Sequence, residues 1–294
     1  MSQKQAGMML FEIEELLRRL PAFKRMPIKV IREENKLYEK LKKLFHSRFV
    51  KILDQLKKEG LPSSDLQRKE LLHPLIELEG EYINTIIEGT KEALRYGRQD
   101  VFNNLQKIGY LKVKKAKSTL EVIFRDFSPE ILKIIRNKTF IASQKTMDRI
   151  IGDVMESLSK SYAQGLGIDK AADVLEEKFV SMENYELRRI ARTEINQAQN
   201  KGAFYTEQEL GVEYHQWIAT IDGRQRESHE ILNGEIVRVG EPFSNGLLYP
   251  GDTSGDIEEW INCRCREVPF LMPEGYMAPP GVLCFYEEDL VRID

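Results

Sequence analysis

The regular spacing of apolar residues in the chain before Gly211 is the feature that most constrains its fold. Within residues 31–58 these residues recur at steps of three and four, which is the period of one helix face. The positions are Leu37, Leu41, Leu44, Phe45, Phe49, Ile52 and Leu56. The pattern predicts a long amphipathic helix whose apolar face packs against other helices.

Further helices are expected on both sides of this one. An amphipathic pattern covers residues 8–20. The segment EGLPSSD then breaks the period, and Ser64 or Asp65 is expected to cap a second helical region. That region runs to about Leu105, and Pro74 should kink or restart it because proline cannot continue the hydrogen bonds of a helix.

The segment before Gly211 continues with a helical body. Ser128 followed by Pro129 is typical of a helix start, and this helix is expected to reach Ala163, with or without a break. A short helix and then the segment ENYELRRIARTEINQAQNKGAFYTEQELG follow the glycine stop in QGLG. The last segment has one face on which small residues allow a neighbouring helix to approach closely. That face consists of Leu187, Ala191, Ile195, Ala198 and Gly202.

The character of the sequence changes at Gly211. VEYHQWIATID is rich in β-branched and aromatic residues, and turn dipeptides follow at Asp222-Gly223 and Asn233-Gly234. RESHEIL is long enough for two helical turns, whereas EIVRV and NCRCREV read as strands. A compact α+β unit is therefore expected after Gly211.

The expected fold class is α+β and mostly α, with an elongated helical body followed by a small α+β module that has a short sheet. We divide the chain into a basic helical N-terminal region (1–127), a helical body (128–210), the α+β module (211–272) and a C-terminal tail (273–294). The tail begins as an extended linker and is able to dock on the body or on a partner.

Charge is unevenly distributed over the chain. Residues 1–127 hold 26 Lys and Arg against 18 Asp and Glu, whereas residues 128–294 hold 18 against 29. Such polarity can orient a protein between an anionic neighbour and another protein, although two solvated helical faces are the simpler explanation. A basic cluster is a candidate for contact with DNA phosphates without sequence reading, or else a solvated loop. It consists of Lys112, Lys114, Lys115 and Lys117.

Membrane insertion and disulfide frameworks are not expected. The sequence has no run of 18 apolar residues, and its N-terminus carries acids where a signal peptide needs an apolar stretch, so we expect synthesis in a cytosol. The chain has three cysteines, and Cys263 and Cys265 are too close in sequence to pair with each other in relaxed geometry.

Cys263 and Cys265 are instead a candidate half of a metal site. Residues i and i+2 of a strand point to the same side, so both sulfurs would share one face while Arg264 points away. A tetrahedral zinc site needs two more ligands, for which His229, Asp222 and His215 are candidates. His229 is the best of these because it lies in the same small unit. Two buried small residues with a hydrogen-bonded His229 are the alternative.

A catalytic interpretation is also open for this region. An acid/base site or a polar network that braces the loops would use Asp222, Arg224, Arg226, His229 and Arg264. A metal-dependent enzyme centred on Asp222, His229, Cys263 and Cys265 is the corresponding alternative function. The sequence shows no serine or cysteine nucleophile in a motif with the pair Asp222 and His229.

The ARTE sequence at residues 191–194 invites comparison with the arginine and glutamate of ADP-ribosyltransferases. Those enzymes draw the two residues from separate strands, whereas Arg192 and Glu194 lie on one predicted helix, about 200° apart. The two side chains therefore cannot converge on one ligand. We expect Arg192, Asn196 and Asn200 to form a polar edge that ties the helix to the α+β unit.

Several motifs in a fixed order resemble the phage Mu F-like minor head protein family, also called the phage head morphogenesis family. They are IARTEINQAQNKGAF, GVEYHQWIATIDGRQRESHEILNGEIV, PF, YPGD and INCRCREVPF, and they cover about residues 150–272. Gln225 is a departure, since the family usually has threonine there. The matching positions are Arg192, Thr193, Glu194, Asn200, Gly202, Trp217, Asp222, Arg226, His229, Asn233, Gly234, Pro250, Gly251, Asn262, Cys263, Arg264 and Cys265.

The resemblance implies a minor structural protein of a tailed double-stranded DNA virus or prophage. Members of this family are associated with the portal vertex, and some are fused to toxin or enzyme domains. Only about 22 residues follow the module here, too few for such a domain. The resemblance therefore implies a purely structural chain with no enzymatic activity and with residues 211–272 as its Mu F-like module.

These observations lead to one expected function and to stated alternatives. We expect a head protein that binds the portal and the major capsid or scaffold protein, acts in head morphogenesis, and contributes to DNA packaging or ejection. It would be located in the virion, after assembly in the host cytoplasm, with no membrane contact and with no cofactor or one structural zinc. A non-specific DNA-binding internal virion protein is the remaining alternative.

Overall fold

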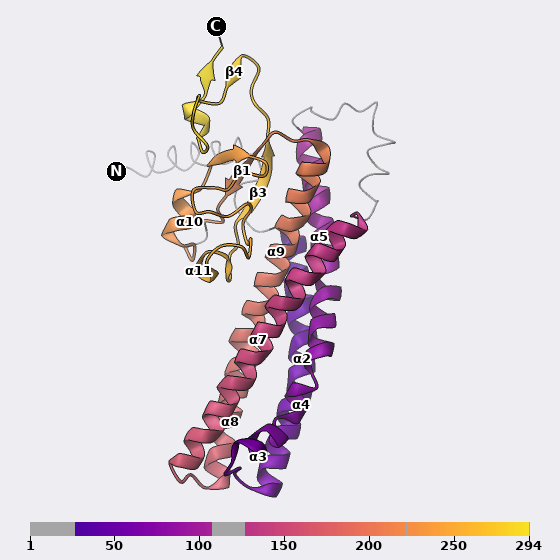
Figure 1. Ribbon diagram of the computed structural model, residues 1–294, viewed down its shortest axis with the longest axis vertical. Coiled ribbons are helices and arrows are strands. Elements are labelled where there is room, and N and C mark those ends of the chain that lie inside the picture. The colour runs from indigo at the N-terminus through magenta and orange to yellow at the C-terminus, as the bar shows by residue number, and fades with distance from the viewer. Residues whose placement is uncertain (1–26, 108–126, 222, 294) are drawn as a thin grey trace, which may run out of the picture.

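The computed structural model describes residues 27–107, 127–221 and 223–293, and it shows an elongated helical bundle with a small α+β module at one end (Figure 1). The expected fold class is confirmed. The expected helix over residues 8–20 and the basic cluster between Lys112 and Lys117 lie outside the described residues. None of the described helices is both long and apolar enough to cross a membrane.

The bundle is built from long helices that run along its axis. Ile168 to Leu210 form one continuous helical rod, which contains a π-helical turn where α8 meets α9. The helices are α2 (Ile28–Glu59), α3 (Asp65–Leu71), α4 (His73–Ile76), α5 (Glu79–Lys107), α7 (Pro129–Ala163), α8 (Ile168–Ser181), the π turn η2 (Met182–Glu186) and α9 (Leu187–Leu210).

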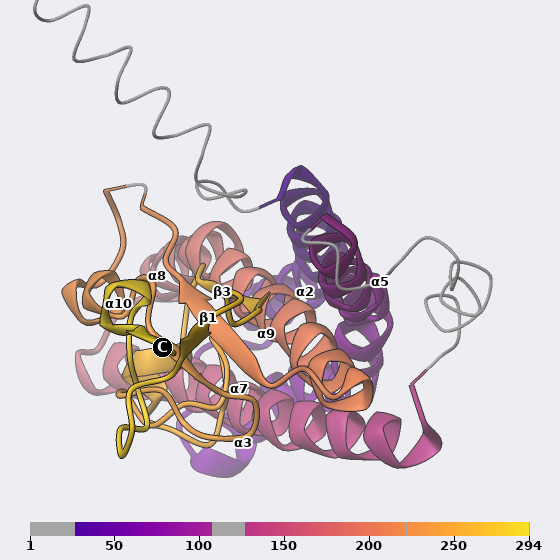
Figure 2. The ribbon, with the colours of Figure 1, turned by 90° about the horizontal axis from the view of Figure 1, so that it is seen from above.

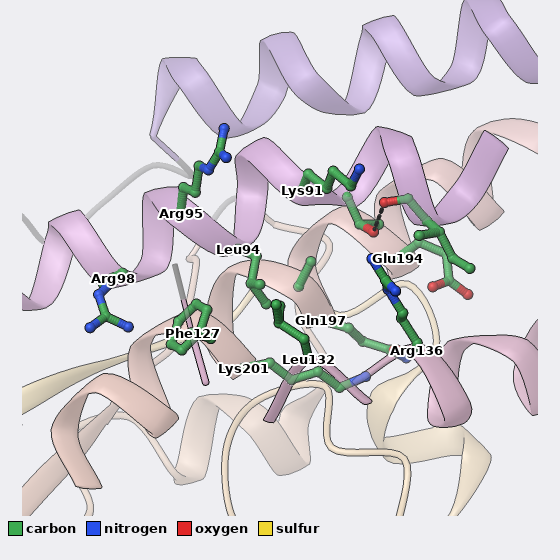
Figure 3. A pocket seen from close by; sticks show the side chains of 13 residues that line it. Lys91, Leu94, Arg95, Arg98, Phe127, Leu132, Arg136, Glu194, Gln197 and Lys201 are labelled. Atoms are coloured by element: carbon green, nitrogen blue, oxygen red, sulfur yellow. Dashed lines mark hydrogen bonds between the residues drawn. The ribbon is translucent and has the colours of Figure 1, made fainter. Parts of the chain in front are cut away.

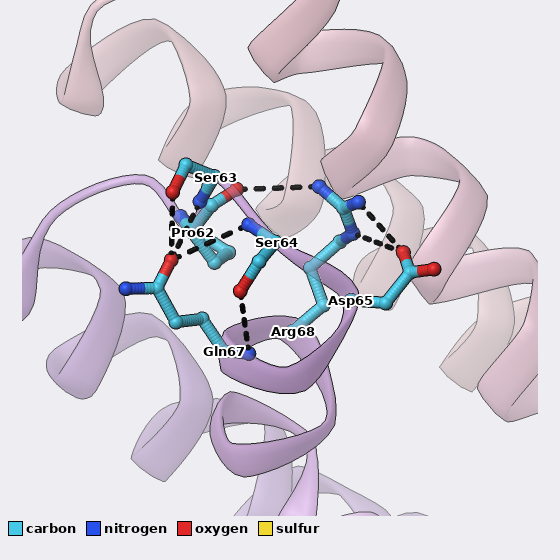
Figure 4. Close-up of polar contacts among 6 residues, drawn as sticks. All are labelled: Pro62, Ser63, Ser64, Asp65, Gln67 and Arg68. Carbon is cyan, nitrogen blue, oxygen red and sulfur yellow. Dashed lines mark hydrogen bonds and ion pairs between the residues drawn. The ribbon is translucent and has the colours of Figure 1, made fainter.

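The helix cap expected at Ser64 is present. Ser64 is the N-cap of α3, and its hydroxyl accepts a hydrogen bond from the backbone N–H of Gln67 (Figure 4). The side chain of Gln67 accepts in return from the backbone of Ser64, which completes a capping box. Arg68 then bonds to Asp65 and to the carbonyl of Pro62, so the turn between α2 and α3 is fixed from both sides.

The start of α7 is also as expected, and α7 is unbroken. Ser128 accepts from the N–H of Ile131, and Pro129 occupies the first helical turn. At the other end of the body, α9 stops at Gly211, which has the left-handed φ of 64° that favours glycine.

The apolar stripe of α2 faces the centre of the bundle. Leu44 is partly buried, and the other predicted positions of the stripe are buried. Phe49 stacks on Phe179 of α8 with ring centroids 4.0 Å apart, and Phe45 meets Tyr82 of α5 edge to face at 5.7 Å. Each such side chain contributes about 1.5–3 kcal/mol through burial.

Helices α5 and α9 approach each other most closely where each has a glycine. A Cβ atom added to Gly202 would lie 2.0 Å from the carbonyl oxygen of Leu94, and one added to Gly97 would lie 1.8 Å from that of Gln199. The small face that the sequence predicted for this helix therefore does allow backbone-to-backbone contact.

The α+β module packs along α9 (Figures 1 and 2). Its antiparallel sheet has the order β2-β1-β3, so β1 (Tyr214–Ile218) is central between β2 (Ile236–Arg238) and β3 (Arg266–Phe270). Two short helices, α10 (Glu227–Ile231) and α11 (Ile257–Trp260), lie in the connections.

The tail of the chain folds back onto the module. Phe285 pairs with Ile236 through backbone hydrogen bonds in both directions, and its ring packs edge to face on Tyr214. The tail also contains a two-stranded sheet of β4 (Tyr276–Met277) and β5 (Val291–Arg292), and the short 3-10 helix η3 (Glu287–Asp289).

One local expectation was wrong. The sequence placed Cys263 and Cys265 on the closing strand, but β3 begins at Arg266 and both cysteines lie in the irregular loop before it. Asn262 starts this loop with a left-handed φ of 55°, which strand backbone does not adopt. The loop geometry therefore replaces strand alternation in directing the two sulfurs.

Replacing Gly202 with alanine should destabilise the protein strongly, because the new methyl group would collide with backbone that cannot move aside. We expect the free energy of unfolding to fall by about 3 kcal/mol or more. The matched control is Gly152→Ala, since Gly152 lies in helix α7 with nothing within 4 Å of the added Cβ. That control should gain about 0.5–1 kcal/mol. Urea unfolding followed by circular dichroism distinguishes the two, and equal effects would contradict the close approach.

Candidate functional site

The Arg-Thr-Glu motif of α9 joins the bundle to the module. The guanidinium of Arg192 donates to one carboxylate oxygen of Glu34 on α2 at 2.9 and 3.1 Å, and to the side-chain oxygen of Asn262 at 3.0 Å. The hydroxyl of Thr193 accepts from the backbone N–H of Asn262 at 2.9 Å. Arg192 thus connects α2, α9 and the loop that carries both cysteines.

Asn200 makes a second connection two turns further along α9. Its side-chain nitrogen donates to the carbonyl of Cys265 at 3.0 Å, and its side-chain oxygen accepts from the N–H of Glu267 at 3.3 Å. Asn200 is 1% exposed, so water cannot replace these bonds. The amide side chain therefore pairs with the backbone at the start of β3 in the manner of a neighbouring strand.

Glu194 lines a cavity of about 210 Å³ between α5, α7 and α9 (Figure 3). Burial raises the pKa of Glu194 to about 7, and the attraction of Lys201 opposes this rise. Lys201 lies two turns after Glu194 on α9, and burial lowers its pKa. The cavity is otherwise basic, since its charged lining includes Lys91, Arg95, Arg98, Arg136 and Lys201.

A second cavity, of about 590 Å³, lies between α7, α9 and the module. Thr193 and Glu194 contribute to its lining from α9, and Trp260 contributes from α11. Glu194 is therefore shared by both cavities, while Arg192 is not among the residues that line either one.

His229, Cys263 and Cys265 form a compact cluster in the module. The Nδ1 atom of His229 lies 3.6 Å from the sulfur of Cys263 and 3.4 Å from that of Cys265. All three residues are buried, with at most 3% of each exposed. The structure therefore brings together the three residues that the sequence proposed as metal ligands. Two sulfurs and an imidazole nitrogen are a donor set found in zinc sites.

The two thiols of this cluster differ in acidity. A hydrogen bond from the thiol of Cys263, supported by His229, lowers the pKa of Cys265 to about 5, although burial opposes the change. The same hydrogen bond, together with burial, raises the pKa of Cys263 well above its ordinary value. For His229, burial alone would lower the pKa, but its hydrogen bond to Cys265 gives a net rise. Cys265 is thus the more acidic thiol of the pair.

A second buried cluster was missed by the sequence reasoning. His215 Nδ1 lies 3.2 Å from a carboxylate oxygen of Glu207 and 3.1 Å from one of Glu267, and the three side chains have no exposed surface. Burial raises the pKa of Glu267 to about 8. Burial lowers the pKa of His215, but hydrogen bonds to the two glutamates bring it to about 9. Burial also raises the pKa of Glu207. The close approach of His215 to both carboxyl groups offsets part of the cost of burying these polar side chains.

The remaining predicted residues are mostly bound into the module. Trp217 is fully buried and packs edge to face on His229. Arg226 donates to the carbonyl of Ile261, and the side chain of Asn233 accepts from the N–H of Ala219. Gly234 has a φ of 95°, which suits its expected turn. Asp222 lies outside the described residues, so the proposed centre that includes it is only partly described.

Residues 152–268 match the protein family described as Phage Mu protein F like protein, which confirms the resemblance. The chain is 29% identical over 130 residues to the NAD(+)-arginine ADP-ribosyltransferase EFV of Enterococcus faecalis, and this match covers 42% of the chain and 26% of that enzyme. It is 34% identical over 64 residues to an uncharacterized protein of Haemophilus influenzae, which covers 22% of the chain and 12% of that protein. The chain thus spans only a minor part of both relatives, and no solved structure matches it.

Replacing Asn200 with alanine should loosen the module from α9. The change leaves the buried carbonyl of Cys265 and the N–H of Glu267 without their partner, so we expect a loss of about 3 kcal/mol in the free energy of unfolding. Asn103→Ala on the exposed side of α5 is the matched control and should change stability by less than about 0.5 kcal/mol. Chemical unfolding measures both, and hydrogen exchange should increase at β3 only in the first variant.

Proposed function

Since residues 152–268 of this chain are those of a Phage Mu protein F like protein, we propose that it is a minor head protein acting in the head morphogenesis of a tailed double-stranded DNA virus or prophage. The family match is the observation that carries the proposal. It spans the last part of α7, all of α8 and α9, and the module as far as β3. The family-related sequence thus covers the helical rod together with the sheet that is bonded to it.

The arrangement of polar contacts supports a binding role over a catalytic one. Arg192, Thr193 and Asn200 use their hydrogen-bonding groups within the protein, on Glu34, Asn262 and the start of β3. These side chains fix the module on the bundle and so give the chain one defined shape. A fixed shape of this kind is what a component of an ordered assembly needs, because rigid partners lose less conformational entropy on binding.

We assign the portal protein as the main partner and the major capsid or scaffold protein as a neighbour. The excess of acidic residues after residue 127 and of basic residues before residue 128 gives the two ends of the sequence opposite charge. The basic region is the part proposed to contact packaged DNA non-specifically, in the virion or in the procapsid that forms in the host cytoplasm.

The ADP-ribosyltransferase named among the relatives does not make this chain an enzyme in our proposal. Arg192 is held by Glu34 and Asn262, whereas Glu194 lines the two cavities beside Lys201, so the two side chains face different surroundings. The matched region is also a minor part of that enzyme. The metal-dependent enzyme with Asp222 is the other catalytic hypothesis, and the described residues provide three of its four groups.

The purified full chain should co-elute with the portal oligomer of the same virus or prophage when the two are mixed at moderate salt. The major capsid protein in its unassembled form serves as the comparison, and an unrelated acidic helical protein as the negative control. Size-exclusion chromatography with mass determination gives the stoichiometry of the complex. A chain that elutes apart from the portal oligomer at every ratio would contradict the assignment of this partner.

The chain should not consume NAD⁺, because no pair of side chains in the motif converges on a ligand. Release of nicotinamide and labelling of an arginine-rich acceptor protein are the two measurements, with a known ADP-ribosyltransferase as positive control. Turnover in the wild-type chain that disappears in Glu194→Gln would refute the non-enzymatic assignment.

A further inference from the structure

We propose that His229, Cys263 and Cys265 bind one structural zinc ion in the small module. The three donor atoms lie within 4.8 Å of one another. At a tetrahedral zinc, with Zn–N of about 2.0 Å and Zn–S of about 2.3 Å, nitrogen and sulfur ligands are about 3.5 Å apart. The separations of 3.6 and 3.4 Å between His229 Nδ1 and the two sulfurs match this value. Two of the three donor separations therefore already fit a bound ion, and a fourth ligand would complete the tetrahedron.

The imidazole of His229 is held in the orientation that a metal ligand requires. Its Nε2 atom lies 3.1 Å from a carboxylate oxygen of Glu259, and Asn245 donates to the same oxygen at 3.2 Å. A carboxylate on one ring nitrogen fixes the tautomer and leaves the other nitrogen free to bind metal. The edge-to-face contact with Trp217 adds a steric constraint on the ring. The Nε2 side of His229 is thus held by Glu259, and its Nδ1 atom faces the two sulfurs.

The loop that carries the cysteines is constrained independently of the metal. Its first residue, Asn262, is bonded to Arg192 and Thr193 of α9, and the carbonyl of Cys265 is bonded to Asn200. The backbone N–H of Cys265 also donates to the sulfur of Cys263 at 3.4 Å, as backbone amides do to metal-bound thiolates. Both sulfurs are therefore in place before an ion arrives.

A structural role follows from the burial of the cluster and from the size of the core around it. His229 lies 34 residues from Cys263, so the ion would link α10 to the loop before β3. Among the described residues, the buried apolar cluster around these ligands is small and consists of Trp217, Ala219, Leu232, Val237, Phe243, Leu247, Cys263 and Cys265. A separate small cluster is formed by Tyr214, Ile236 and Phe285. Small cores of this kind commonly depend on a metal or on disulfides for stability.

The chemistry of the two buried clusters assigns zinc to the thiol cluster. Thiolates are soft ligands that select zinc, whereas the cluster around His215 offers only carboxylate oxygens beside its nitrogen. The Nδ1 atom of His215 already lies 3.2 Å from a carboxylate oxygen of Glu207 and 3.1 Å from one of Glu267. One zinc ion per chain, and not two, is the expected stoichiometry.

Elemental analysis of the purified full chain under reducing conditions tests the assignment. We expect one equivalent of zinc in the wild-type protein and in Cys284→Ser, and none in Cys263→Ser. Cys284 is the matched control because it is the third cysteine and lies outside the cluster, against the carbonyl of Pro242. Zinc that persists in Cys263→Ser but is lost in His215→Gln would place the ion at the other cluster and overturn the proposal.

A second measurement uses the wild-type chain, so its result does not depend on whether Cys263→Ser folds. A chelator removes the zinc, circular dichroism confirms that the bundle is still helical, and Co²⁺ is then added. Tetrahedral visible bands together with thiolate-to-cobalt charge-transfer absorption are expected, and a folded chain that takes up neither cobalt nor zinc refutes the site. Glu259→Gln keeps all three donors and should weaken zinc binding about 10- to 100-fold.

Discussion

The contact between the backbones of α5 and α9 is the constraint on which the remaining structure depends. Gly97 and Gly202 each lack the side chain that would separate the helices, and the carbonyls of Leu94 and Gln199 occupy that space. The opposite side of α9 is then free to present polar side chains to the module. Helix α9 contacts both the bundle and the module. It can fix the position of the module relative to the bundle only if its own position in the bundle is fixed.

The interface between α9 and the module combines apolar packing with hydrogen bonds. Phe204 of α9 packs on His215 and Tyr249 of the module, and the polar contacts determine the register. Arg192, Thr193 and Asn200 bond to backbone or side-chain groups at defined positions of the loop and of β3. Hydrogen bonds between buried groups contribute modestly to net stability, but a shifted register would leave each of them unsatisfied at a considerable cost. The interface therefore selects one placement of the module among the many that an apolar contact would permit.

The sequence predicted the helical part well because its signals are local. The spacing from Leu37 to Leu56 and the caps at Ser64 and Ser128 depend on residues only a few positions apart, and the structure agrees with them. The cysteines were expected to share a face because of strand alternation, yet the sulfurs converge through a loop that starts at Asn262.

The second buried cluster had no local signal in the sequence. Glu207, His215 and Glu267 come from α9, β1 and β3, and a glutamate on a helix ordinarily indicates a solvated position. The even spacing of His215 and Trp217 on a strand with a buried face was the one available indication, since both side chains then point into the interior. The pairing of the strands, which sequence alone could not give, decides which carboxylates meet His215.

The π turn between α8 and α9 has a consequence for how the molecule can vary. Glu183 in this turn is bonded to His46 of α2 at 2.8 Å, so the extra residue is anchored against the bundle. The hydrogen bond of a π turn spans five residues where that of an α-helix spans four, so the π turn takes up one additional residue. The same residues in a regular α-helix would rotate α9 by about 100° relative to α8. The π turn between Phe179 and Leu187 therefore determines the direction in which α9 presents the module.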